Sequence, residues 1–440
     1  MQYCLFLLKI KEAFIMKRRH FIKTTAVLSL AAAAFPGFAE ILKQGKGNAF
    51  LTVRRITNGP KFHWFGYYDK LQIDPTNRYA LGLQTDFEGR TPTPADTITI
   101  GMIDLQNNDT WIKLGESKAW CWQQGCMLQW LPGSKDDVIW NDREGGQFVS
   151  HILNVHTGKK RTLPKPVYTL SPDAKWALGL DFGRLQDLRP GYGYQGVPDK
   201  YKDLKAPDKT GIYHLDITTG KDKLLIPYSE CSAMPHLGED ISNYWHWYNH
   251  LLINPGGERF LFLSRWRKER IFTDQGTGFI TRMFTSNKNG EDLYVLDPSG
   301  NTSHFVWRDN EHVCAWTKPI GAADGFYLLK DKTQDIQKVG EGVMIVNGHN
   351  TYLPNKNNEW ILNDCYPQGK ERLQTPYLYN VPANKRYDLG NFYEPDTYKG
   401  EFRCDLHPRY SPNGKMVIID STHEGMGRQM YLIGISELVN

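Results

Sequence analysis

The 440-residue chain lacks the short motifs that identify many enzyme classes. It has no Gly-x-Ser-x-Gly nucleophile elbow, no His-Glu-x-x-His zinc motif and no phosphate-binding P-loop. An active site that depends on one of these contiguous motifs is therefore excluded. Any chemistry must come from residues that are scattered along the chain and brought together by the fold.

The sequence also lacks closely spaced cysteine pairs, long apolar runs and the periodicity of amphipathic helices. The seven cysteines include no Cys-x-x-Cys pair, so no disulfide framework is implied. No segment beyond the N-terminal region is long and apolar enough to span a bilayer, and none has an amphipathic helical period of normal length. Apolar residues still make up 40% and aromatic residues 13% of the chain, enough for a large core. We expect a folded mature protein without a membrane span.

The first 39 residues have the pattern of an export signal. A basic run from Lys17 to Lys23 precedes an apolar stretch over 24–34, and small residues follow at Gly37 and Ala39. We predict a signal peptide over 1–39, with Met16 as an alternative start, and a periplasmic or cell-surface location. The paired arginines fit a twin-arginine signal, and an ordinary secretory leader fits equally well.

The predicted mature chain has no excess of positive or negative charge. Removal of the leader takes six of the 53 basic residues and one of the 48 acidic residues, which leaves 47 of each. A nucleic-acid-binding protein normally carries a net basic field, so we expect no nucleic-acid partner.

Proline-containing turns recur between short apolar segments. They lie at Asp74-Pro75, Leu131-Pro132, Ser171-Pro172, Asn254-Pro255, Leu353-Pro354 and Ser411-Pro412. Strand ends with polar turns recur around Asp104, Asn154, Asp216, Asp297, Asp331, Asn380 and Gly434, on average about 55 residues apart. This spacing matches a four-stranded blade. We predict an all-β, single-domain, seven-bladed β-propeller over residues 48–440, closed by pairing of residues 50–56 with 430–435.

Two insertions interrupt the repeat, and loops on a propeller often carry function. The first spans Gly183 to Lys209, and the second follows Arg265-Trp266-Arg267 and runs to Arg282. Arginine binds carboxylates through two hydrogen bonds, and aromatic rings stack on sugars. These insertions and Arg143 supply candidate substrate-binding residues: Arg143, Arg184, Arg189, Tyr192, Tyr194, Arg265 and Arg267. The alternative is that both insertions are solvated loops.

Histidine occurs in two further settings. His63 lies among five aromatic residues in the segment Lys61–Lys70, a setting that favours a neutral imidazole and therefore a general base. A buried histidine that bonds to the backbone is the alternative. Four later histidines could bind a metal together with cysteines or could bond between blades: His250, His349, His407 and His423. Polar residues 123, 124 and 141–143 are candidates for the central funnel or for turns.

Six segments resemble glycoside hydrolase family 145, which consists of seven-bladed propeller α-L-rhamnosidases. The segments are 61–70, 120–130, 140–143, 250–257, 347–354 and 403–412. The resemblance covers essentially the whole mature chain. It extends to the propeller rhamnose–glucuronate lyases and, more distantly, to the oligogalacturonate lyases.

This resemblance implies a specific substrate and a catalytic residue. Family members release L-rhamnose that is α-1,4-linked to glucuronic acid at the ends of arabinogalactan side chains, and they use a single histidine. His63 matches that histidine, and Trp64 beside it is a candidate for substrate binding. The implied protein is an exo-acting α-L-rhamnosidase, a monomer that needs no cofactor and acts on an acidic plant glycan.

Two other functions remain open. A lyase would cleave the rhamnose–glucuronate linkage, or another uronate linkage, by β-elimination in the central funnel. The candidate arginines and tyrosines would then bind the uronate, and His349 and His407 could hold a divalent metal. The third function is binding of glycans without catalysis, which the aromatic content alone favours.

Overall fold

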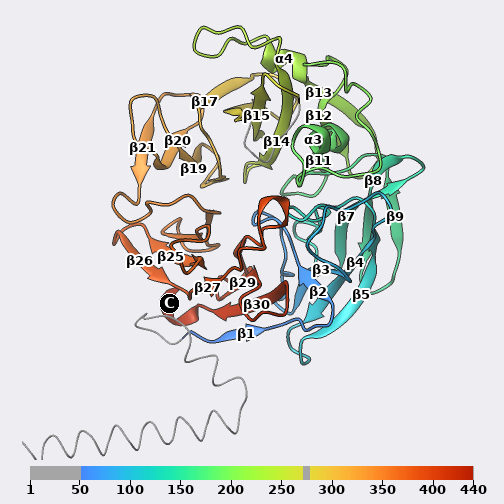
Figure 1. Ribbon diagram of the computed structural model, residues 1–440, viewed down its shortest axis with the longest axis vertical. Helices are drawn as coiled ribbons and strands as arrows, with labels where there is room; N and C mark the ends of the chain where they lie inside the picture. Colours follow the sequence, from blue (N-terminus) through green and yellow to red (C-terminus); the bar gives the residue numbers. More distant parts are fainter. Residues whose placement is uncertain (1–50, 271–277, 440) are drawn as a thin grey trace, which may run out of the picture. The chain divides into compact units, whose positions relative to one another are not determined.

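Seven four-stranded antiparallel sheets form the computed structural model, which describes residues 51–270 and 278–439. The sheets follow one another around a central axis as the blades of a β-propeller (Figure 1). The predicted all-β, seven-bladed architecture is therefore confirmed. The predicted signal peptide over 1–39 lies outside the described residues.

The first three blades are contributed by the first half of the chain. Blade 1 consists of β2 (Phe62–Trp64), β3 (Tyr79–Thr85), β4 (Ile98–Asp104) and β5 (Thr110–Ser117). Blade 2 consists of β6 (Gln129–Trp130), β7 (Asp137–Glu144), β8 (Gln147–Asn154) and β9 (Lys160–Leu163). Blade 3 consists of β10 (Thr169–Leu170), β11 (Trp176–Gly179), β12 (Gly211–Asp216) and β13 (Asp222–Pro227).

The remaining four blades follow in order. Blade 4 consists of β14 (Trp245–Ile253), β15 (Arg259–Arg267), β16 (Ile280–Asn287) and β17 (Tyr294–Gly300). Blade 5 consists of β18 (Phe305–Trp307), β19 (His312–Thr317), β20 (Gly325–Lys330) and β21 (Ile336–Val339). Blade 6 consists of β22 (Thr351–Tyr352), β23 (Trp360–Asn363), β25 (Tyr377–Asn380) and β26 (Lys385–Asp388), and a separate ribbon pairs β24 (Leu373–Gln374) with β27 (Phe392–Tyr393). Blade 7 consists of β28 (Arg409–Tyr410), β29 (Met416–Ser421), β30 (Gln429–Gly434) and β1 (Val53–Arg55).

Blade 7 joins the two ends of the described chain, as the sequence predicts. Its strand order is β1-β30-β29-β28, so the earliest strand forms the outer edge of the last blade. The amide of Ile56 donates to the carbonyl of Met430 at 2.9 Å, and the hydroxyl of Thr57 donates to Gln429 Oε1 at 2.8 Å. In Figure 1 the blue strand β1 accordingly lies beside the red strand β30. This pairing closes the ring.

Proline-containing turns connect the first and second strands of six blades. In the turn after Asn254, for example, the side-chain oxygen accepts hydrogen bonds from the amides of Glu258 and Arg259, both at 3.1 Å. One predicted strand end is wrong: Asp297 lies in β17, the fourth strand of blade 4, and the third strand ends at Asn287. Both strands end in a polar turn, so the sequence pattern alone does not distinguish them.

Apolar cores lie between neighbouring blades. The second strand β15 is buried at eight of its nine positions because another blade covers each of its faces, whereas three of four residues in the outer strand β9 are exposed. Between blades 7 and 1 the core contains Ile56, Ile103 and Ile418. The blades therefore support one another from within.

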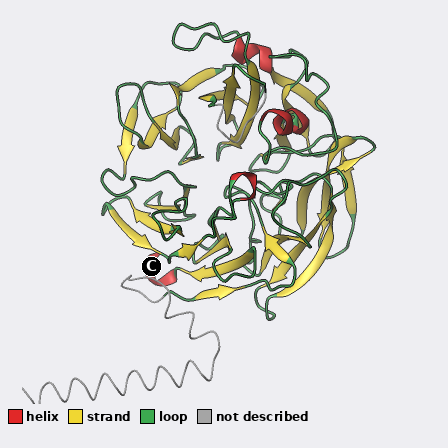
Figure 2. Ribbon diagram, viewed as in Figure 1, coloured by secondary structure: helices red, strands yellow, loops and turns green. Residues whose placement is uncertain are grey.

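Helices are short and few in the described chain (Figure 2). They are α3 (Phe182–Leu188), α4 (Tyr228–Ser232), the 3-10 turn η1 (Gly400–Phe402) and α5 (Ser436–Val439). Within the described residues no helix combines the length and the apolarity needed to cross a bilayer. The six described cysteines are all free and buried.

Candidate active site

Four consecutive blades place a histidine at the same position, four residues before the residue that closes the first hairpin. These histidines are His250, His304, His349 and His407. Their closing residues are Asn254, Arg308, Leu353 and Ser411, each of which donates its amide across the hairpin. Because the innermost strand of each blade faces the propeller axis, the shared position brings the four imidazoles together. Blades 4 to 7 thus build an arc of histidines.

Tyr68 of blade 1 lies at the centre of this arc. Its ring centroid is 5.6 Å from that of His250, 6.0 Å from His304, 5.1 Å from His349 and 6.3 Å from His407. The Tyr68 hydroxyl donates to the Phe305 carbonyl at 3.0 Å and accepts from the Phe305 amide at 3.2 Å. One tyrosine therefore bridges from blade 1 to blade 5 across the axis.

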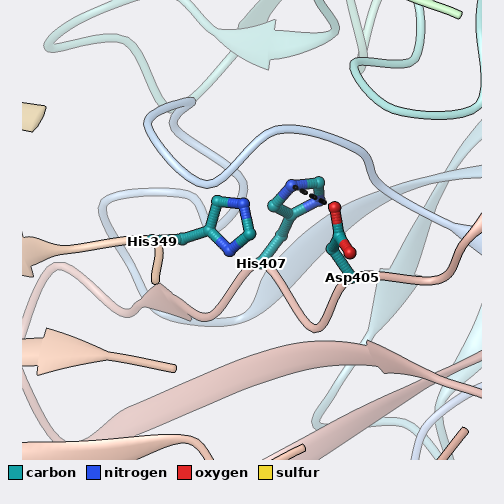
Figure 3. Close-up of side chains that lie close together, drawn as sticks. All are labelled: His349, Asp405 and His407. Atoms are coloured by element: carbon teal, nitrogen blue, oxygen red, sulfur yellow. Dashed lines mark ion pairs between the residues drawn. The ribbon is translucent and has the colours of Figure 1, made fainter. Parts of the chain in front are cut away.

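His349, Asp405 and His407 have the arrangement of metal ligands. Their ligand atoms all lie within 4.8 Å of one another, and all three side chains are buried. Figure 3 shows the two imidazoles next to each other, with the Asp405 carboxylate beside His407. The Nε2 atom of His407 is 3.8 Å from Asp405 Oδ2. Imidazole nitrogen and carboxylate oxygen together suit a first-row divalent cation.

The surroundings of these three residues fit a cation. The Nδ1 atom of His349 is 2.9 Å from Asp364 Oδ1, so Asp364 orients the ring and leaves Nε2 for a ligand. Burial, followed by the neighbouring His349, holds the pKa of His407 well below its usual value, so its imidazole is neutral and able to coordinate. The buried atom Asp405 Oδ1 has no hydrogen-bond partner in the described chain. A buried carboxylate oxygen without a hydrogen-bond partner, close to the neutral imidazole of His407, favours a bound cation.

Tyr67, His250 and Asp69 form a second buried group on the axis. The Tyr67 hydroxyl is 3.3 Å from His250 Nδ1, and His250 Nε2 is 3.3 Å from Asp69 Oδ2. Burial lowers the pKa of His250 to about 4 despite the opposing effect of Asp69, so His250 is neutral at neutral pH. Burial raises the pKa of Tyr67 well above its usual value, so its phenol keeps its proton. This arrangement can pass a proton from Tyr67 to His250.

Arginines surround the same region. Arg403 donates from Nε to Asp405 Oδ2 at 2.8 Å and from Nη2 to the Tyr192 hydroxyl at 2.7 Å. The guanidinium of Arg189 lies over the Tyr192 ring at 4.9 Å. Burial, and then the charge of Arg189, lower the pKa of Arg265 to about 10. Positive charges that crowd together in a buried region favour an anionic ligand.

The sequence-predicted residues Arg189, Tyr192, Arg265, His349 and His407 therefore gather around one axis. Arg184 and Tyr194 lie elsewhere, inside the first insertion. All five N–H groups of Arg184 bond within the protein, to the carboxylate of Asp199 and to the carbonyls of residues 201, 204, 205 and 246. Tyr194 stacks on Phe182 at 4.2 Å. In this structure these two side chains hold the insertion together.

Arg143 and Arg267 also contact backbone carbonyls. Arg143 Nη1 donates to Gln195 at 3.1 Å, which ties blade 2 to the first insertion. Arg267 Nη2 donates to Leu188 at 2.7 Å and to Arg270 at 2.8 Å. Both arginines thus bond to the backbone of the first insertion.

His63 lies in β2 and is 3% exposed. Its Nδ1 is 3.0 Å from Gln429 Oε1, and its Nε2 is 2.8 Å from Gln84 Nε2, so the amides fix Nδ1 as the donor and Nε2 as the acceptor. Burial lowers the pKa of His63 to about 4. Trp64 beside it is 1% exposed and packs against Trp120 and Trp122. A neutral His63 agrees with the sequence expectation, and its catalytic role stays a prediction.

Sequence reasoning missed several residues of the axial site. His304 was missed because Asp309 replaces proline in its hairpin, although its spacing to that hairpin is the same as in the other three blades. Asp364 carries no local signal, whereas Tyr67, Arg403 and Asp405 lie in the segments 61–70 and 403–412 that carry the family resemblance.

When the chain is compared with known proteins, it is similar to solved structures but matches no family model and no curated protein. Neither a scan against family models nor a search of curated proteins gives a match. The chain is similar to an oligogalacturonate lyase from Vibrio parahaemolyticus, with a TM-score of 0.61 and 14% identity over 90% of this chain and 97% of that chain. It is also similar to an oligogalacturonate lyase in complex with manganese, with a TM-score of 0.62 and 14% identity over 90% of this chain and 96% of that chain. At this identity the similarity shows the fold, which this chain shares with oligogalacturonate lyases.

Proposed function

We propose that the protein is a glycan lyase that cleaves a uronate linkage by β-elimination at the propeller axis. One observation carries the proposal: a set of cation ligands, a neutral histidine paired with a tyrosine, and a group of arginines all converge there. Two solved propellers to which this chain is similar are oligogalacturonate lyases, and one of them is a manganese complex, which supports this function.

Recognition of the uronate carboxylate is the first requirement of the reaction. Elimination begins with loss of the proton on C5, which becomes acidic only when the adjacent carboxylate is neutralised. Arg189 and Arg265 supply positive charge beside Tyr67. A divalent cation on His349, Asp405 and His407 would supply further Lewis-acid neutralisation when bound.

Proton removal is the second requirement. Tyr67 takes the C5 proton as it passes its own proton to His250 Nδ1, and Asp69 stabilises the imidazolium that results. Burial by itself raises the pKa of Asp69, but Lys70 and His250 outweigh burial and lower that pKa to about 2, so the carboxylate is ionised. Electrons from the C5–H bond form the C4–C5 double bond while the C4–O bond breaks. Tyr67 then donates the proton that it took from C5 to the departing oxygen and regains its own proton from His250, so both groups return to their starting states.

The decisive experiment follows two products from the same incubation. The mature protein is incubated with rhamnose-capped arabinogalactan and, separately, with oligogalacturonate, in the presence of Mn²⁺ or of a chelator. Free rhamnose and the ultraviolet absorbance of the unsaturated uronate are both recorded. We expect the unsaturated product from at least one substrate, its loss with chelator, and a fall of about 100-fold or more in kcat for Tyr67→Phe.

The rhamnosidase predicted from sequence resemblance gives the opposite pattern. It would release rhamnose and leave a saturated glucuronate, it would be insensitive to Tyr67→Phe, and it would lose activity in His63→Gln. This pattern would exclude the lyase. Binding of acidic oligosaccharide without any product, at every enzyme concentration, would instead indicate a glycan-binding protein. We propose in each case an exported protein that meets an acidic glycan outside the cytoplasm.

A further inference from the structure

A second convergence of possible ligands lies in blade 2, away from the axial histidines. Strand pairing builds it: β7 and β8 are joined by a two-residue turn at Gly145-Gly146, and His151 of β8 lies opposite Trp140 of β7. Alternate residues of a strand face the same side, so Asp142 and Glu144 share the face of Trp140. Both carboxylates consequently lie beside the His151 ring.

The distances show that three atoms converge on one point. The Nε2 atom of His151 is 3.3 Å from Asp142 Oδ2 and 3.2 Å from Glu144 Oε1. All three ligand atoms lie within 4.8 Å of one another. Around a tetrahedral ion with bonds of about 2.0–2.2 Å, ligand atoms lie about 3.3–3.6 Å apart. The separations in blade 2 are close to that spacing.

His151 and Asp142, the two more deeply buried side chains of the three, are each oriented by further hydrogen bonds. The Nδ1 atom of His151 is 3.0 Å from Thr162 Oγ1, on the paired strand β9, and an Nδ1–H donor there leaves the Nε2 lone pair directed at the carboxylates. Asp142 Oδ1 accepts from the amides of Lys118 and Arg143, at 2.8 and 2.7 Å, so Oδ2 remains for a ligand. The Trp140 ring packs edge-on against the imidazole at 5.4 Å.

The carboxylates of Asp142 and Glu144 are not balanced by a basic side chain among the described residues. Within the described chain, the ion pairs of Asp142 and Glu144 are all with His151, which is itself 1% exposed. Neither carboxylate has an ion pair with a lysine or arginine of the described chain, and a bound cation would supply that missing positive charge.

We propose that Asp142, Glu144 and His151 bind a divalent transition-metal ion such as Zn²⁺, at a site separate from the propeller axis. One imidazole nitrogen and two carboxylate oxygens form the donor set, and Glu144, which is half exposed, leaves the remaining position to water. The ion would clamp the tip of the β7–β8 hairpin, where Arg143 contacts the first insertion. This inference does not depend on the proposed lyase activity.

Metal content is the measurement that tests the site. The His349→Ala/His407→Ala variant is used so that the axial ligands are removed, and bound Zn²⁺ is counted after equilibrium dialysis. We expect one equivalent of zinc in this variant, none after His151→Gln is added, and affinity at least about tenfold weaker after Glu144→Gln. Thr162→Val, which removes only the group that orients His151, should weaken binding by about 10- to 100-fold.

A matched control lies in the same blade. His156 Nε2 is 3.2 Å from Asp136 Oδ1, and both side chains are well exposed, so this pair has one carboxylate instead of two. His156→Gln should leave zinc binding unchanged. Glu144 lies at the exposed hairpin tip, so Glu144→Gln tests the site without disturbing the core. Absence of zinc from the His349→Ala/His407→Ala variant would overturn the proposal, as would zinc binding that persists in both His151→Gln and Glu144→Gln.

Discussion

Histidine has two distinct uses in this propeller, and the hydrogen-bond partners distinguish them. Both ring nitrogens of His63 are engaged by amide side chains, those of Gln429 and Gln84. Asp364 holds only Nδ1 of His349, so Nε2 has no hydrogen bond within the described residues. A ring with both nitrogens satisfied is suited to stabilise the fold, whereas a ring with one oriented, open nitrogen is suited to bind a ligand.

The buried His63 predicts a dependence of stability on pH. Its pKa falls from 6.5 in the unfolded chain to about 4 in the fold, so between these values the unfolded state binds more protons. Stability therefore rises with pH across this window and levels off above pH 6.5. Replacing His63 by Gln should reduce the difference in the free energy of unfolding between pH 4.5 and pH 7 by about 2–3 kcal/mol. Urea titrations at the two pH values measure the change, and an unaltered difference would show that the ring titrates normally.

A buried ion pair supports the first insertion in addition to its apolar packing, which includes Leu185, Leu188 and Tyr194. The side chains of Arg184 and Asp199 are 0% and 1% exposed, and the same arginine collects carbonyls from the insertion and from β14. Arg189 and Tyr192 lie in this insertion, so the position of two axial residues depends on that arginine.

Substitution of Arg184 by Met should therefore lower the free energy of unfolding by about 3–5 kcal/mol, because Asp199 and the carbonyls lose their partner inside the protein. The matched control is Arg270→Met, which removes the half-exposed pair with Asp187 and should cost less than about 1 kcal/mol. Chemical denaturation of both variants gives the comparison. Equal losses in the two variants would refute the role assigned to Arg184.

Closure of the ring is a property of the whole molecule. Blade 7 takes its outer strand from the other end of the described chain, and an unclosed propeller would expose the edge of β30. A variant that begins at residue 57 lacks β1 and should unfold at a lower temperature than one that begins at residue 51. It should also self-associate through the free edge. Calorimetry and light scattering test both effects, and identical behaviour of the two variants would show that β1 is dispensable.

Much of this architecture could be predicted from sequence because propeller turns leave local signals. The dipeptide Ser411-Pro412 and the equivalent proline-containing turns indicate six hairpins. The residues before Thr57 have the pattern of a β-strand that could close the ring. The residues of the axial site were harder to predict from the sequence. Nothing in the sequence distinguishes Arg184 from Arg265. Arg184 donates its hydrogen bonds to groups inside the protein, including the Lys205 carbonyl, whereas Arg265 lies at the axis, and this difference depends on tertiary contacts.

Closure by the first and last strands also sets the order of events during synthesis. Thr57 and Met430 are 373 residues apart and bond directly, so the pairing cannot form until nearly the whole chain has left the ribosome. Six blades can be complete while β1 waits for β28, β29 and β30 of the seventh blade to be synthesised. During that interval the nascent ring is an open arc with two unpaired edges, and a chaperone that covers β1 would delay release of the finished ring without contacting any other blade.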